Sequence, residues 1–565
     1  MIGPGGSRAQ AAAVHRRPRL IAVALILVAV ALLLGAALVT PALVTGMLGD
    51  ADFTDSRIAT VLGGSKYDAS FSSGVIQGTL HDVRLLAAVL GVLCVLLGLA
   101  LLVRPAEVAR LRGWLVHRLS KLNPRRMDYT FCAAISLVAL FVTLVATRNG
   151  AGMDPDSIVY IAAGRGLFMG EGFGDLVLWP PGYPLLIAGF MHLGMAAEQS
   201  ARLVVALSLA LAVYPLCALG RILGGRVAGY LSCLIPLAMW PLALVSVYAW
   251  SEMPYILFSL CAVLCLTALV MGSHDRQRLW VLGGAAVLAG MAALTRYTGV
   301  SLVAAGGILL LLNFRVELRR RMGETIAFCG LAALPAGAWV VRNLATTGTL
   351  AGERPAGTSG LVHNALTTVS RIASDATSGD AIGTLWPPGA VVAVAVVGVL
   401  IATMVVCALK GDPERKLLRG YLHRASPVMC YTVVYLAAFI ATASLWTFLP
   451  IYVRFLTPAY PFLALLLISF GSCFVSGVRA VPFRSVLVGM FAAVLVLLAA
   501  LQLPCTLLIH NGAQQGYSYA SPFWKNAESI DWAQRNLPDD ATVYTNDAYA
   551  LRLRLPDTRL VAPRG

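Results

Sequence analysis

Long apolar runs separated by short basic clusters constrain the fold of this chain more than any other feature. The first run, Leu20–Val44, would extend roughly 37 Å as a helix, which exceeds the thickness of the hydrocarbon core of a bilayer. This run is longer than the apolar core of a cleaved signal peptide and indicates a retained span. Because 58% of the residues are hydrophobic and only 12% are charged, the sequence predicts an all-α polytopic membrane protein.

Apolar runs of spanning length predict about thirteen transmembrane helices. Their approximate positions are 20–45, 85–103, 128–147, 200–220, 227–249, 253–272, 279–295, 298–313, 324–342, 387–409, 427–447, 456–475 and 485–504. The positive-inside rule places the basic clusters at 104–126, 315–321 and 410–424 in the cytoplasm, next to membrane lipids. The N-terminus is then cytoplasmic, whereas the C-terminus and the loops 46–84, 148–199 and 343–386 are external.

Three regions follow from this pattern: a two-span N-terminal addition (1–127), a transmembrane core (128–504) and a small external α+β segment (505–565). The segment 179–194 is apolar, but the prolines at its start and its modest length favour a helix lying at the outer interface. The Trp-Pro-Pro-Gly string at its start recurs at 386–389, which we interpret as shared helix-start chemistry at headgroup level.

The formal net charge of +16 does not indicate nucleic-acid binding, because the basic clusters lack interleaved aromatic residues and a folded basic domain. The eleven cysteines lie in or beside apolar runs, and we interpret them as packing residues. The sequence has no Gly-rich phosphate loop after a strand and no cytoplasmic stretch large enough for a nucleotide-binding domain. A transferase of this kind would take its donor from the membrane.

Acidic residues in the external loop 148–199 are the first candidates for chemistry. Asp154-Pro155 is typical of a helix start, with Asp154 as the cap and Pro155 in the first turn. Asp156 then lies near a helix N-terminus, which favours its charged form. Two interpretations remain open: both aspartates merely start an interfacial helix, or Asp156 is an ionised base with Tyr160 one turn away on the same face.

Further charged residues lie near the outer ends of predicted helices. They are Glu252, Arg296, Arg342 and Arg454. Any one of them can be an interface anchor with its charge in the headgroup region. Several that converge on one face indicate a cavity for an anionic group.

The order of these motifs resembles the GT-C superfamily of integral-membrane glycosyltransferases. The shared pattern comprises Asp156-Ser157-x-x-Tyr160, Gly170-x-Gly172, Trp179 to Leu186, Arg202, Ser251-Glu252-x-Pro254, Leu294 to Gly299, Arg342-Asn343 and Arg454-Phe455-Leu456-x-Pro458. It is similar to the bacterial branch with protein mannosyltransferase-like and aminoarabinose transferase-like enzymes, over roughly residues 128–550. The resemblance implies a GT-C-like core with interfacial helices in the first large external loop.

The activity implied by the resemblance is transfer of a sugar from a polyprenyl-phosphate carrier to an envelope glycan, lipid or protein acceptor. It would take place at the outer face of the bacterial cytoplasmic (inner) membrane. Asp156 corresponds to the catalytic base, with Asp154 as a neighbouring alternative. Glu252 corresponds to a second acidic position that binds acceptor or sugar, or holds a metal in some relatives. No cofactor is certain, and a divalent metal remains an open alternative.

The basic residues complete the implied site. Arg296, Arg342 and Arg454 correspond to residues near the carrier phosphate, where guanidinium groups stabilise the charge of the leaving group. One base opposite one phosphate clamp favours a single displacement with inversion. Tyr160 belongs to the substrate loop of the resemblance, together with Trp179 and Tyr183.

Two other classes of function stay open at this point. A transporter or flippase of a lipid-linked or anionic solute would use the same arginines as ligands, although the sequence shows no convincing internal repeat. A catalytically inactive relative that acts as an assembly partner is the second. Both would lack a glycosidic product.

Overall fold

The computed structural model describes residues 124–174, 176–272, 275–376, 412–446, 451–477, 481–538, 541–545, 547–555 and 559–561, with scattered helical positions between 78 and 110 and at 398. The chain divides into two compact units, one of which contains residues 132–565 and therefore all of the candidate site residues. The predicted span 20–45, the string at 386–389, all of 387–409 except position 398, and most of 85–103 lie outside the described residues.

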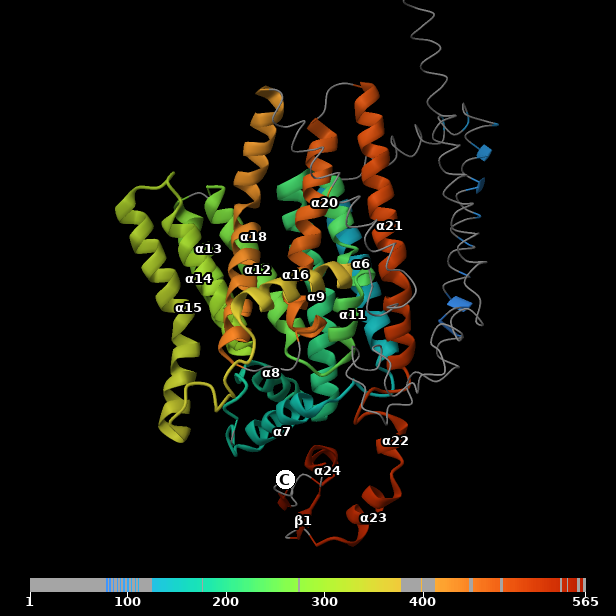
Figure 1. The fold of residues 1–565 in the computed structure, drawn as a ribbon, viewed down its shortest axis with the longest axis vertical. Helices are drawn as coiled ribbons and strands as arrows, with labels where there is room; N and C mark the ends of the chain where they lie inside the picture. Colours follow the sequence, from blue (N-terminus) through green and yellow to red (C-terminus); the bar gives the residue numbers. More distant parts are fainter. Residues whose placement is uncertain are drawn as a thin grey trace, which may run out of the picture. The chain divides into compact units, whose positions relative to one another are not determined.

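Eight helical stretches within these described ranges are long and apolar enough to cross a membrane. They belong to α6 (Pro124–Ala146), α9 (Ala197–Ser232), α12 (Glu252–Val270), α13 (Asp275–Thr295), α15 (Leu318–Thr347), α18 (Asp412–Leu445), α20 (Tyr460–Gly477, preceded by α19, Val453–Leu456, and η3, Thr457–Ala459) and α21 (Val481–Ala513). Figure 1 shows α9, α12, α18, α20 and α21 running roughly in one direction. The all-α polytopic class is therefore confirmed, and the number thirteen stays a prediction.

Two predicted spans differ in form from the prediction. The segment 227–249 is not one helix: α9 runs through a non-helical Gly225 (φ 84°) to Ser232, and α10 (Ile235–Ala238) and α11 (Trp240–Val247) follow. Pro236 and Pro241 stand in the first turns of these short helices, because a proline without an N–H interrupts a longer one. The span predicted at 298–313 is η2 (Tyr297–Gly299) followed by α14 (Val300–Leu311).

The loop 148–199 contains two helices that lie across one end of the long helices (Figure 1). They are α7 (Pro155–Met169) and α8 (Gly182–Met191). With ten residues, α8 extends about 15 Å, half the thickness of the hydrocarbon core, so it cannot span a membrane. A Cβ on Gly182 would lie 2.6 Å from the carbonyl oxygen of Leu294, so glycine lets α8 lie directly against the end of α13.

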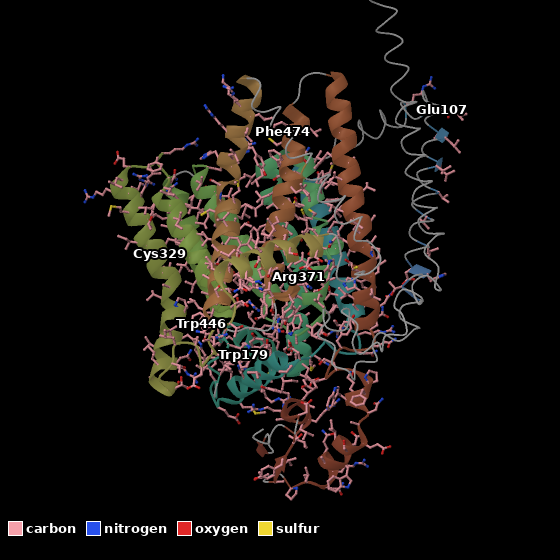
Figure 2. All side chains as sticks on the ribbon, viewed as in Figure 1. Glu107, Trp179, Cys329, Arg371, Trp446 and Phe474 are labelled. Atoms are coloured by element: carbon pink, nitrogen blue, oxygen red, sulfur yellow. The ribbon has the colours of Figure 1, made fainter. Side chains whose placement is uncertain are left out.

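The loop 343–386 contains a helix that we did not predict, α16 (Leu361–Ala376). Figure 1 shows α16 crossing the direction of the long helices. Its last carbonyl groups are satisfied from other helices: Trp240 Nε1 donates to Asp375 O (2.9 Å), and Gln502 Nε2 donates to the carbonyl oxygens of Asp375 and Ala376 (2.8 Å each). Arg371, labelled in Figure 2, forms an i,i+4 ion pair with the buried Asp375.

The C-terminal segment begins later than predicted, because α21 continues through Pro504 to Ala513. It contains α22 (Pro522–Lys525), α23 (Glu528–Asn536), β1 (Thr542–Tyr544), α24 (Ala548–Arg554) and β2 (Arg559–Val561). The two strands pair in parallel, with Val543 opposite Leu560. Figure 1 shows this segment beside α7.

Candidate active site

A short extended stretch before α7 fixes the position of the acidic motif. On one side Gly152 N donates to Val247 O (2.8 Å) and Ala249 N donates to Gly152 O (2.9 Å). On the other side Tyr519 N donates to Met153 O (3.0 Å). A Cβ on Gly152 would lie 2.8 Å from the ring of Tyr248, so this close pairing requires glycine. The pairing brings the starts of α7 and α12 together.

Asp154 caps α7, as the sequence predicted. Its Oδ1 accepts hydrogen bonds from Ser157 N and Ser157 Oγ, both at 2.9 Å, and Pro155 occupies the first turn. Asp156 follows within that turn, where the helix dipole favours a negative charge.

Arg454, in α19, connects the three acidic residues of the site. Its Nε donates to Glu252 Oε1 (2.5 Å), its Nη1 to Asp154 Oδ2 (3.0 Å), and its Nη2 lies 2.7 Å from Asp156 Oδ2. The guanidinium lies 4.0 Å from the ring centroid of Trp250. We call Asp154, Asp156, Glu252, Arg296 and Arg454 the charged cluster.

Arg296 reaches the charged cluster from the break between α13 and η2. Its Nη1 forms an ion pair with Glu252 Oε1 and lies 3.4 Å from Ser251 Oγ. Ser251 Oγ also lies 3.1 Å from Tyr160 Oη, which connects the α7 tyrosine to the cluster. Within the described structure, Arg296 Nε and Glu252 Oε2 have no hydrogen-bond partner.

The members of the charged cluster differ in access to solvent. The Asp156 side chain is 29% exposed, Asp154 18% and Glu252 0%, while Arg454 is 5% exposed. Burial raises the pKa of Asp156; Arg454 opposes this effect, and the negative charges of Asp154 and Glu252 add to it. Asp156 is thus the most accessible carboxylate of the cluster, and its pKa is raised.

The three predicted substrate-loop aromatic residues pack together. Tyr160 makes edge-to-face contacts with Trp179 (ring centroids 6.3 Å apart) and Tyr183 (5.2 Å). Tyr183 is fully buried and its Oη donates to Ala201 O, so it packs α8 against α9. Trp179, labelled in Figure 2, lies at the end of the bundle where α7 and α8 are found.

Arg342 lies apart from the other predicted phosphate ligands. It donates to the carbonyl oxygens of Gly174 (2.7 Å) and Leu176 (2.8 Å), and its guanidinium lies over the ring of Trp339. The structure therefore brings Arg296 and Arg454 together, whereas Arg342 holds the loop between α7 and α8. A role for Arg342 at the carrier phosphate stays a prediction.

Arg354 is a cationic neighbour of the site that we missed. Its Nη2 donates to Leu178 O (2.9 Å). Burial lowers the pKa of Arg354, and Tyr297 and Asp156 act in the opposite direction. No periodicity or motif marks the loop that carries it. Tyr435 was also missed: its Oη donates to Phe455 O (2.7 Å), next to Arg454.

The charged cluster does not fit a divalent metal in this arrangement. Magnesium and calcium require several oxygen ligands around one point, and here the carboxylates of Asp154, Asp156 and Glu252 converge on the Arg454 guanidinium. In the described part of the chain, one group of three potential metal ligands lies close together, namely Cys132, Cys217 and Cys233 in the bundle.

Comparisons with known proteins concern most of the chain. Residues 179–339 match the family described as dolichyl-phosphate-mannose-protein mannosyltransferase. The solved structure of ArnT from Cupriavidus metallidurans bound to undecaprenyl phosphate is similar, with a TM-score of 0.50 and 16% identity over 76% of this chain and 85% of that one. The archaeal oligosaccharyltransferase AglB from Archaeoglobus fulgidus, in complex with an inhibitory peptide and a dolichol-phosphate, gives 0.42 and 13%, over 76% and 64%. No curated protein sequence matches.

Proposed function

We propose that this chain is a membrane glycosyltransferase of the GT-C superfamily and that it transfers a sugar from a polyprenyl-phosphate carrier to an acceptor hydroxyl of an envelope glycan, lipid or protein. The family match over residues 179–339 and the ArnT-like fold support the enzyme class over the transporter alternative. The carrier is proposed because the similar ArnT structure holds undecaprenyl phosphate.

The observation that carries this proposal is the accessibility of Asp156 within an otherwise buried charged cluster. Asp156 is 29% exposed, whereas Glu252 is fully buried between two arginines. A general base must reach the proton that it removes, so Asp156 suits that role. Asp154 already caps α7 and pairs with Arg454. Glu252 neutralises Arg296 and Arg454.

The proposed reaction is a single displacement. The acceptor oxygen attacks the anomeric carbon while its proton passes to the Asp156 carboxylate, and the bond between the anomeric carbon and the phosphate oxygen breaks. The electron pair of that bond leaves with the carrier phosphate. Attack opposite the leaving group inverts the anomeric configuration.

Arg296 is the better candidate to stabilise the leaving phosphate. All three donor nitrogens of Arg454 already contact carboxylates, so Arg454 orients the acidic residues. Arg296 is 14% exposed and retains an Nε without a partner in the described structure. We place the reaction at the outer face of a bacterial cytoplasmic membrane, with the N-terminus inside, because the basic loops predict that orientation.

The test compares two conservative variants of the full chain in lipid nanodiscs. Release of polyprenyl phosphate is measured with a panel of undecaprenyl-phosphate hexoses and pentoses. Asp156→Asn is expected to lower turnover by about 10²-fold or more, because the base is lost. Asp154→Asn keeps a capping side chain, so a loss of less than about tenfold is expected. Undiminished turnover in Asp156→Asn would remove this residue as the base.

A further inference from the structure

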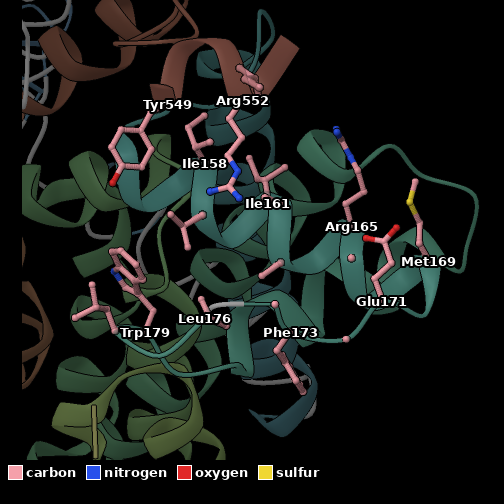
Figure 3. A pocket seen from close by; sticks show the side chains of 18 residues that line it. Ile158, Ile161, Arg165, Met169, Glu171, Phe173, Leu176, Trp179, Tyr549 and Arg552 are labelled. Atoms are coloured by element: carbon pink, nitrogen blue, oxygen red, sulfur yellow. The ribbon is translucent and has the colours of Figure 1, made fainter. Parts of the chain in front are cut away.

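A cavity lies beside α7. Its volume is about 420 Å³, which is within the usual range of small-molecule sites. Its walls are α7, residues 171–174 and 176–179 of the following loop, and α24 of the C-terminal segment (Figure 3). Ile158, Ile161 and Leu176 provide apolar surface, while the aromatic rings of Trp179 and Tyr549 stand at its edge.

The charged groups of this cavity are mainly cationic. Arg552 extends from α24 toward α7, beside Ile158 and Ile161, and Arg165 and Glu171 line another part (Figure 3). In the described structure, neither Arg552 nor Arg165 forms an ion pair with a carboxylate. Among the described lining residues, two guanidinium groups without an ion pair outnumber the one carboxylate, which favours an anionic ligand because guanidinium forks match carboxylate oxygens.

The cavity and the charged cluster both adjoin α7. Asp156 points toward Arg454, whereas Ile158, Ile161 and Arg165 of the same helix line the cavity. Trp179 contacts Tyr160 and also lines the cavity, so it lies between them.

We propose that this cavity binds an acidic sugar unit of the acceptor, other than the unit whose hydroxyl reacts. The proposal rests on the proposed function. Apolar and aromatic walls suit the faces of a sugar ring, and the Arg552 guanidinium, which extends toward Ile158 and Ile161, suits its carboxylate. A wall that carries guanidinium groups does not suit a hydrocarbon chain.

The test measures binding of two probes to the full chain in nanodiscs by saturation-transfer NMR titration. Glucuronate is expected to bind at least about tenfold more tightly than neutral glucose, because only glucuronate forms charge-assisted hydrogen bonds. Arg552→Ala is expected to abolish this preference. Arg554→Ala is the matched control, since it removes the same charge from the same helix at a residue outside the cavity wall.

Binding of undecaprenyl phosphate, measured in the same samples, separates this inference from the proposed function. Carrier binding with equal affinity for glucuronate and glucose would overturn the cavity proposal and leave the proposed function intact. A glucuronate preference that survives in Arg552→Ala, or that Arg554→Ala removes equally, would also overturn it. Failure of the wild-type chain to bind any carrier lipid would instead count against the proposed function.

Discussion

Replacing Arg454 by methionine tests whether this arginine organises the carboxylates of the site. Methionine retains much of the side-chain volume and removes the charge and the three contacts to Glu252, Asp154 and Asp156. Burial already raises the pKa of Asp156, and Arg454 opposes that effect. Without Arg454 the pKa of Asp156 rises further, so a higher pH is needed to ionise the proposed base.

The magnitudes follow from the contacts. A hydrogen bond to a charged group contributes about 1.5 to 3 kcal/mol, and one pKa unit corresponds to about 1.36 kcal/mol, so the acid limb of the pH–rate profile should move upward by about 1 to 2 pH units. Breaking a buried ion pair costs about 3 to 5 kcal/mol of stability. We expect the lower end, about 3 kcal/mol, because Asp154 and Asp156 are partly exposed and Glu252 keeps Arg296.

The assay is polyprenyl-phosphate release as a function of pH, together with thermal unfolding in detergent. Arg278→Met is a matched control: Arg278 is as buried as Arg454 (both side chains 5% exposed) and binds Glu324 through two nitrogens at 2.6 Å, outside the charged cluster. Both variants should lose stability, and only Arg454→Met should move the acid limb. An acid limb that stays in place or moves downward in Arg454→Met would refute the reasoning.

Two further predictions concern the packing around the site. Gly182→Ala places a Cβ 2.6 Å from the carbonyl oxygen of Leu294, so we expect a stability loss of about 1 to 3 kcal/mol and lower turnover. The control is Gly189→Ala in the same helix, whose Cβ meets no atom within 4 Å and should change neither stability nor turnover. Equal thermal unfolding of the two variants would contradict this prediction. Tyr435→Phe removes the hydrogen bond to Phe455 O, which should lower the stability of the fold by about 1 kcal/mol. We expect kcat to fall by less than about tenfold and the KM for the donor to stay unchanged. A changed KM with an unchanged kcat would show that Tyr435 contacts the donor instead.

Local signals in the sequence predicted several features of the site. Asp154 and Pro155 identified the start of α7 because capping depends on neighbouring residues alone, and the structure has that cap. Trp250, which stacks on Arg454, was not predicted. It stands two residues before Glu252, so the motif that identified Glu252 could also have identified Trp250. No motif in the sequence marks Arg354. Its place near the site depends on the contact of its loop with Leu178, and that loop has no periodic pattern.

The sequence by itself determined the class of the protein and the candidates for its site. Apolar runs of spanning length leave only a helical membrane fold, since backbone groups in lipid must be satisfied within each segment. Tertiary structure alone decided which charges meet. Residues 154, 252, 296 and 454 come together because Gly152 pairs with Tyr248 and because breaks precede α14 and α20. Contacts of this kind depend on packing between distant segments, which periodicity and composition do not encode.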